Sequence, residues 1–240
     1  VILAPTSRSL THTEARRRAC ARGARVASMP GATEEMLARA VPVDYERMAE
    51  RCRSLAEALT RAIEAHLTTP LGTDLTLPLG ERQGIADTGL LRRPGDYGNL
   101  PAGEGFIAPL EGLADGILVV DASLAGIGIL DAPIVLTIRH GAIVAVEGGA
   151  AADEFRATLD RVGPAARVLC ELGIGANDRA RITGIVLEDE KVFGTVHIAF
   201  GNNVGFGGTN DVPFHVDGVV TQPTLTLDGR PLLLDGKPQF

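Results

Sequence analysis

Two segments near the C-terminal end carry the side chains best suited to chemistry. In Phe214-His-Val-Asp-Gly218, His215 and Asp217 are separated by one residue, so on a strand both side chains project from the same face. A neutral imidazole beside a carboxylate on one rigid face forms half of a metal site. A histidine–aspartate pair on the protein surface is the alternative interpretation.

His197 lies in an otherwise apolar segment, 196–201, and precedes His215 by 18 positions. A lone histidine in such a segment is more often a core residue with satisfied hydrogen bonds than a metal ligand. The Gly-rich connection between the two segments allows them to pair as strands. That pairing favours a ligand role for His197.

Two glutamates could complete the site. Glu171 lies in the apolar segment 168–172, where a buried carboxylate would require a cation or strong hydrogen-bond donors. An exposed position at the edge of a sheet is the alternative. Glu104 lies between two glycines, where the backbone can bend to present it, and an ordinary exposed loop residue is the alternative.

Glu111 and Glu190 are weaker candidates, because the charged run 188–191 is typical of a solvated turn. The stronger candidates share hard or borderline ligand chemistry and include no thiolate. They suit one or two divalent ions such as zinc, cobalt, manganese or iron, and a carboxylate can bridge two ions about 4 Å apart. The predicted metal ligands are Glu104, Glu171, His197, His215 and Asp217.

The elements that position these residues change in character near residue 70. Before it, Ala, Arg and Glu dominate, and a strand at 1–5, a helix ending at Gly23 and a strand at 24–28 predict a β-α-β unit. A long helix is expected over 43–66, with Met48, Cys52 and Ile63 among the residues on its apolar face. We expect further residues upstream of Val1, because the chain starts as if within a strand.

After residue 70 the segments are short, apolar and rich in glycine, which is typical of strands. His140-Gly141 and Asp228-Gly229 predict two-residue hairpin turns, and 151–162 predicts an amphipathic helix. The expected class is α/β, with an N-terminal α/β segment at 1–70 and a larger metal-binding domain at 71–240. That domain would contain a mixed, largely antiparallel sheet with flanking helices.

Composition excludes several classes of function. The net charge of −7 disfavours a nucleic-acid partner, which usually requires a basic excess. No apolar run approaches the ~18 residues of a membrane helix, so no membrane partner is expected. The three cysteines lack Cys-x-x-Cys spacing and do not indicate a disulfide framework. With no signal peptide expected, we predict a cytoplasmic protein.

Four blocks of the sequence resemble a known family. The block 101–109, the Glu171-Leu-Gly173 block, the block 189–201 and His215-Val-Asp217 look like the thermophilic metalloaminopeptidases of the M29 type, also called aminopeptidase T. The resemblance covers about residues 95–220. It implies that Glu104, Glu171, His197, His215 and Asp217 fill the five ligand positions of that family in order.

The resemblance has one departure with functional meaning. The family carries a tyrosine that assists catalysis seven residues after the histidine matched by His197, and this chain has Val204 there. The same superfamily includes the 2,5-dihydroxypyridine dioxygenases, which are mononuclear iron enzymes that cleave a ring. Their two-histidine, one-aspartate ligand set would fall on His197, His215 and Asp217.

The leading hypothesis is therefore a metallo-hydrolase, an aminopeptidase that releases N-terminal residues from peptides at two zinc, cobalt or manganese ions. In it, Glu104 or Glu171 would also act in catalysis by shuttling a proton. The second hypothesis is a dioxygenase with one iron(II), acting on a small hydroxylated N-heterocycle. The third is an inactive family member with a structural role, which Val204 motivates. A homodimer is expected by analogy with the family.

Overall fold

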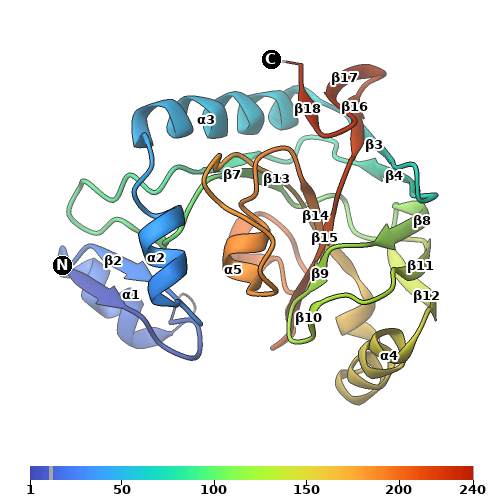
Figure 1. Cartoon of the computed structure of the whole chain (residues 1–240), viewed down its shortest axis with the longest axis horizontal. Coiled ribbons are helices and arrows are strands. Elements are labelled where there is room, and N and C mark those ends of the chain that lie inside the picture. The colour runs from blue at the N-terminus through green and yellow to red at the C-terminus, as the bar shows by residue number, and fades with distance from the viewer. Residues whose placement is uncertain (11–12, 240) are drawn as a thin grey trace.

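The computed structural model describes residues 1–10 and 13–239. Within this part of the chain the strands form three sheets of three, seven and eight strands, with the helices around them (Figure 1). Every pairing in the two larger sheets is antiparallel, whereas the small sheet is parallel. The predicted α/β class with largely antiparallel sheets is confirmed.

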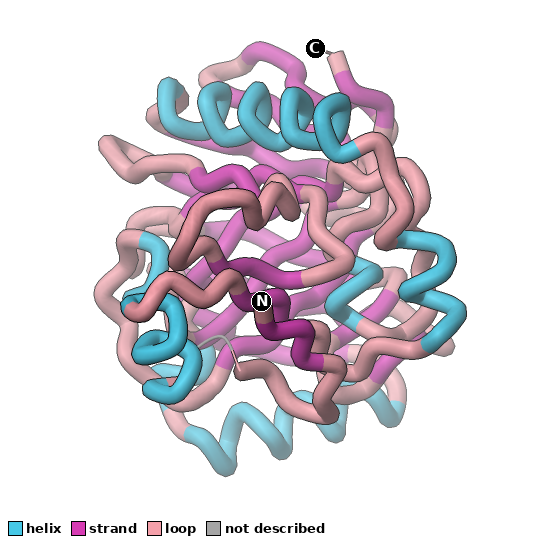
Figure 2. Tube along the Cα trace, turned by 90° about the vertical axis from the view of Figure 1, so that its left-hand side faces the viewer, coloured by secondary structure: helices cyan, strands magenta, loops and turns pink. Residues whose placement is uncertain are grey.

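The small sheet contains the predicted β-α-β unit. Thr13 begins its helix, because the Thr13 side chain accepts a hydrogen bond from the Arg16 amide. The third strand lies after residue 70, so this sheet combines segments from before and after that position. The division into domains at 1–70 and 71–240 stays a prediction. Figure 2 shows the N-terminus on the face toward the viewer, with further strands behind it. The elements are β1 (Ile2–Ala4), α1 (Glu14–Ala21), β2 (Val26–Ser28), α2 (Glu34–Ala40) and β6 (Tyr97–Asn99), with the strands in the order β1-β2-β6.

The eight-stranded sheet contains both predicted hairpins. His140 and Gly141 have φ of 49° and 69°, and Asp228 and Gly229 have φ of 48° and 77°, as a type I′ turn requires. The strand order is β12-β11-β8-β4-β3-β16-β17-β18. The strands are β3 (Glu64–Thr68), β4 (Asp74–Pro78), β8 (Asp115–Val120), β11 (Ile134–Arg139), β12 (Ala142–Glu147), β16 (Thr224–Leu227), β17 (Arg230–Leu234) and β18 (Lys237–Pro238).

The long helix is shorter than expected. Helix α3 (Tyr45–Arg61) ends where Ala62 turns to extended backbone, and the chain continues directly into β3. The Asp228 carboxylate accepts hydrogen bonds from the amides of Ile63 and Glu64 and so holds this junction. Ile63, predicted on the apolar face of the helix, is therefore 62% exposed. The helical spacing of apolar residues extends past the end of α3, but the following segment forms β3, which pairs with β4 and β16.

The seven-stranded sheet carries the candidate site. One face of it packs against α3, where Gly105 lets the helix approach, because a Cβ there would lie 2.4 Å from the Leu55 Cβ. The strand order is β10-β9-β15-β14-β13-β7-β5. The strands are β5 (Ile85–Asp87), β7 (Glu104–Ile107), β9 (Ser123–Leu124), β10 (Gly128–Ile129), β13 (Leu169–Gly175), β14 (Val196–Gly201) and β15 (His215–Val220).

One of the remaining helices lies beside an edge strand of the eight-stranded sheet, and the others are short. The predicted amphipathic helix is confirmed as α4 (Ala150–Val162), which lies beside β12 (Figure 1). The short elements are η1 (Pro164–Arg167), α5 (Val186–Asp189) and η2 (Val204–Phe206). Among the described helices, none combines the length and the apolar content that crossing a membrane requires. The three cysteines are unpaired.

Candidate metal centre

Four adjacent strands bring the five predicted ligands onto one face of the seven-stranded sheet. Residues directly opposite each other in an antiparallel pair project from the same face. Ala199 of β14 is opposite both Glu171 of β13 and Asp217 of β15. The other pairs are Gly173 with His197, Gly175 with Glu104, and Gly201 with His215. Strand pairing therefore assembles a site from residues more than a hundred positions apart.

Small residues opposite the ligands make room for them. Gly173 is the clearest case, because a Cβ there would lie 2.0 Å from the Nε2 atom of His197. The imidazole thus occupies the space above a glycine. The positions opposite the other ligands are Ala199, Gly175 and Gly201.

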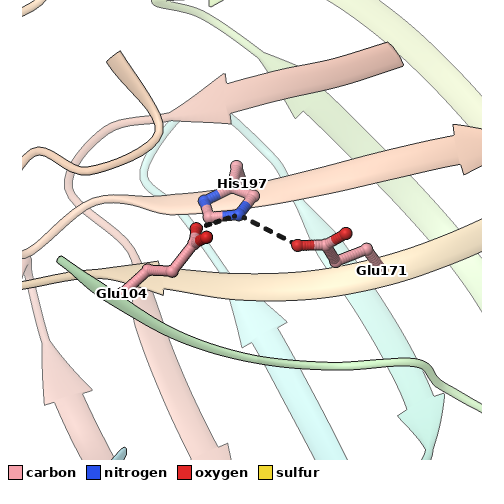
Figure 3. A group of neighbouring side chains, drawn as sticks. All are labelled: Glu104, Glu171 and His197. Carbon is pink, nitrogen blue, oxygen red and sulfur yellow. Dashed lines mark ion pairs between the residues drawn. The ribbon is translucent and has the colours of Figure 1, made fainter. Parts of the chain in front are cut away.

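His197 is buried without a hydrogen bond. Its Nε2 atom lies 3.1 Å from Glu104 Oε2 and 3.5 Å from Glu171 Oε1 (Figure 3). Both ring nitrogens and Glu104 Oε2 lack a hydrogen-bond partner among the described residues. Buried polar atoms without a partner are costly. A cation bound between these atoms would satisfy them.

His215 is oriented by the backbone. Its Nδ1 atom donates to the Asn202 carbonyl oxygen at 2.9 Å, which leaves the Nε2 lone pair free, as in many metal-bound histidines. Nε2 lies 3.5 Å from Glu171 Oε2 and 3.5 Å from Asp217 Oδ1. Two ligand atoms held about 2.1 Å from one ion lie roughly 3.0–3.4 Å apart. These spacings suit shared ligation better than hydrogen bonds.

Three groups of ligand atoms within 4.8 Å of one another could hold an ion: Glu104–Glu171–His197, Glu171–His215–Asp217 and Glu190–His197–Asp217. Among the described residues, no such group contains both histidines. Asp217 nevertheless belongs to one group with His215 and to another with His197. The three groups therefore share residues and form one continuous site. Its imidazoles and carboxylates fit a divalent metal ion.

The electrostatics of the site favour a cation. Burial raises the pKa of Asp217, but His215 and His197 lower it to about 2. Burial likewise raises the pKa of Glu104, but Lys191 and His197 lower it to about 2. Burial lowers the pKa of His197, whereas Glu104 and Glu171 raise it well above its ordinary value. The Asp217 and Glu104 carboxylates thus remain ionised and attract positive charge, whereas burial raises the pKa of Glu171.

The charged run 188–191 is buried, so the predicted solvated turn is wrong. Glu188 and Asp189 are 0% exposed, Lys191 is 2% exposed and Glu190 is 9% exposed. The Arg39 guanidinium donates to both Glu188 oxygens at 2.9 and 3.0 Å. Asp189 accepts from the amides of Thr183 and Gly184. These charges are satisfied by partners far away in the sequence or in the preceding loop.

Sequence reasoning missed Lys191 and Asp87. The Lys191 Nζ atom lies 2.5 Å from Glu104 Oε1, 2.7 Å from Glu190 Oε1 and 3.9 Å from Asp87 Oδ2. One available signal was composition, because the chain has only two lysines against twenty-one arginines. Asp87 gave no signal, since its place beside Glu104 depends on the pairing of β5 with β7.

Glu111 does not join the site. Its carboxylate instead holds the loop between β14 and β15, because Oε1 accepts from Asn203 Nδ2 at 2.8 Å and from the Thr209 amide at 2.7 Å. The other oxygen accepts from Arg82 at 2.6 Å. The role of Glu111 is therefore structural.

An aromatic pair borders the site. Phe106, on the same face as the ligands, packs edge-to-face on Phe206 with ring centroids 5.5 Å apart. Phe206 also lies edge-to-face against His215, at 6.2 Å. Val204, where the aminopeptidases have a tyrosine, is 49% exposed. The loop therefore presents a phenyl ring to the site.

Comparison with known proteins finds relatives of both superfamily branches. A curated 2,5-dihydroxypyridine 5,6-dioxygenase from Pseudomonas putida is 26% identical over 220 residues, which span 84% of this chain and 61% of that protein. The chain thus spans less than two thirds of the length of this relative.

Solved structures show the same two branches. That of 2,5-dihydroxypyridine dioxygenase from Pseudomonas putida superposes with a TM-score of 0.84 at 24% identity, over 98% of this chain and 71% of the other. AmpT from Thermus thermophilus superposes with a TM-score of 0.69 at 25% identity, over 86% of this chain and 58% of the other. The fold is shared with both, and the resemblance to a superfamily containing both is confirmed.

The sequence profile of the 2,5-dihydroxypyridine 5,6-dioxygenases, NicX, matches residues 1–239. The expectation of an aminopeptidase, and with it of a hydrolase or metalloprotease, is wrong, because this profile and the curated relative both carry the dioxygenase name. The four blocks that carried the resemblance did not distinguish the two branches of the superfamily. This chain belongs to the 2,5-dihydroxypyridine 5,6-dioxygenase family.

Proposed function

We propose that this chain carries the iron(II) centre of a dioxygenase that cleaves the ring of a small dihydroxylated N-heterocycle. The observation that carries the proposal is the placement of His197, His215 and Asp217 on one face of one sheet, in a chain that matches the dioxygenase family throughout. Two histidines and one carboxylate form the ligand set typical of non-haem iron(II) oxygenases.

His197, His215 and Asp217 would hold the ion. When bound, iron(II) supplies the redox centre that reaction between dioxygen and a hydroxylated ring requires. The Asn202 carbonyl keeps the His215 imidazole turned toward the site. Glu171, 3.5 Å from each imidazole, is placed to accept a proton from a ring hydroxyl. Phe206 offers an aromatic edge or face to a planar ring.

The test is oxygen uptake by anaerobically purified protein loaded with iron(II) and supplied with 2,5-dihydroxypyridine. Consumption of dioxygen together with loss of the ring absorbance is the expected result. His197→Ala should abolish both, whereas His66→Ala, which removes a surface histidine paired with Asp74, should leave both unchanged. An iron-loaded protein that consumes no dioxygen with any dihydroxypyridine would contradict the proposal and favour an inactive family member.

Two further expectations belong to this proposal. A homodimer is implied by the family resemblance, and size-exclusion chromatography with light scattering tests it. A cytoplasmic location is supported by three unpaired cysteines, and fractionation of the source cells tests it.

A further inference from the structure

A buried lysine lies between three carboxylates beside the candidate metal centre. Lys191 is 2% exposed, and its Nζ atom is surrounded by Glu104 at 2.5 Å, Glu190 at 2.7 Å and Asp87 at 3.9 Å. Several carboxylates around one cation is also how proteins bind a metal ion. The ammonium thus takes a place that a metal ion could occupy.

This ammonium is held firmly in place. The Lys191 amide donates to the Glu188 carbonyl at 3.0 Å, and the Lys191 carbonyl accepts from the Asn177 amide at 2.9 Å. Asn177 is itself buried, with its side chain donating to the carbonyls of Ala40 and Ala102. The backbone on both sides of the lysine is therefore fixed, and its side chain is buried.

Glu104 connects this ammonium with the metal centre. One of its oxygens, Oε1, contacts Lys191, and the other, Oε2, lies 3.1 Å from His197 Nε2. In sites with two metal ions, the ions lie about 3.5–4 Å apart and a carboxylate often bridges them. Glu104 is placed like such a bridge, with the ammonium on one side and the metal centre on the other.

We propose that the Lys191 ammonium substitutes for a second metal ion, so that the centre binds one divalent ion and cannot bind two. The proposal rests on the proposed function only in expecting one metal ion per chain. It assigns Lys191 as a positioning residue whose ammonium pairs with Glu104 and Glu190, lies near Asp87 and repels a second cation. His197, His215 and Asp217 are left to hold the single ion.

The test is metal stoichiometry with manganese(II) as the probe, measured by elemental analysis and by electron paramagnetic resonance. The unmodified protein should bind one ion at saturation and show the spectrum of an isolated ion. Lys191→Met should bind two and show the spectrum of a coupled pair. Lys237→Met, which removes the other lysine of the chain at an exposed position, should still bind one.

Two results would overturn the proposal whatever the oxygenase assay shows: two ions in the unmodified protein, or one ion in Lys191→Met. Because the methionine variant leaves three carboxylates without a cation, it is also prepared with saturating manganese(II). Lys191→Met/Asp87→Asn, with one carboxylate fewer, serves as the second variant and should also bind two. Failure of both to fold with saturating metal would equally overturn the proposal, since the ion should then replace the ammonium.

Discussion

Gly173 lies beneath the imidazole of His197. The pair is directly opposite across β13 and β14, and the absence of a side chain at Gly173 allows the ring to lie over the sheet. Both nitrogens of this histidine lack hydrogen bonds within the described part of the chain. Its orientation therefore depends on packing, including the space that Gly173 leaves for the ring. Glycine is thus required here for space rather than for a special backbone conformation.

Gly173→Ala should therefore weaken metal binding. The added Cβ would lie 2.0 Å from His197 Nε2, so the ring must move, and crowding of this kind costs about 1–3 kcal/mol, or roughly 5- to 150-fold in affinity. Isothermal titration with manganese(II) measures the change. Gly149→Ala, where a Cβ would meet nothing within 4 Å, is the control. Equal affinity in the two variants would contradict the role of Gly173.

Phe206 is the residue of the β14–β15 loop whose ring packs against His215 at the site. Phe206→Leu should raise the KM for a dihydroxypyridine about 2- to 10-fold, because an aromatic contact contributes about 0.5–1.5 kcal/mol. Metal content should not change. Steady-state oxygen uptake measures KM, with Tyr97→Leu, an exposed ring under Arg16, as control. An unchanged KM would remove Phe206 from the substrate site.

At the scale of elements, the loop between β14 and β15 depends on Glu111. Burial raises the pKa of this carboxyl, but the hydrogen bonds from Thr209 and Asn203 and the Arg82 charge lower it below its ordinary value overall. A lowered pKa means that the folded state prefers the ionised carboxylate. This contribution to stability is therefore complete above the ordinary pKa of a glutamate and is lost as the pH falls through the lowered one.

Glu111→Gln should accordingly reduce the free energy of unfolding by about 1.5–3 kcal/mol near pH 7, the range for hydrogen bonds to a charged group. The loss should shrink as the pH falls through the lowered pKa of Glu111, where the unmodified protein protonates this carboxyl as well. Urea denaturation at several pH values measures both effects. A loss that does not vary with pH would indicate that the charge of Glu111 is unimportant.

The run 188–191 shows why an element can be misjudged from its sequence. Four adjacent charged residues are typical of a solvated turn, and nothing local indicates otherwise. Arg39 of α2 neutralises Glu188, while Glu104 of β7 faces Lys191. Those partners are 149 and 87 positions away. Local composition cannot show that a charged residue is buried when the oppositely charged partner lies so far away in the sequence.

On the scale of the whole molecule, the metal centre joins four strands of one sheet. An ion held by side chains from several of these strands would link them, so metal binding should stabilise the entire fold. At a metal concentration 100 times the Kd, linkage gives about 2.7 kcal/mol. For a chain of this size, 1 kcal/mol corresponds to about 2–4 °C in Tm.

Removal of the metal should thus lower the Tm by roughly 5–10 °C, and restoring iron(II) or manganese(II) should reverse the change. Calorimetry of chelator-treated and reloaded protein measures it. His215→Ala protein should respond little to either treatment. A Tm that is independent of metal in the unmodified protein would place the ion outside these four strands.

Sequence patterns were enough for the fold class, for both glycine hairpins and for the choice of Glu104, Glu171, His197, His215 and Asp217 as predicted metal ligands, which the structure brings together on one face of a sheet. These depend on local rules, namely side-chain alternation along strands, turn conformation and ligand chemistry. The family match over residues 1–239 decided between the two branches of the superfamily. Only the tertiary structure placed Lys191, Glu190 and Asp87 beside the ligands. Their positions depend on strand register and on burial against distant segments, which no local pattern encodes.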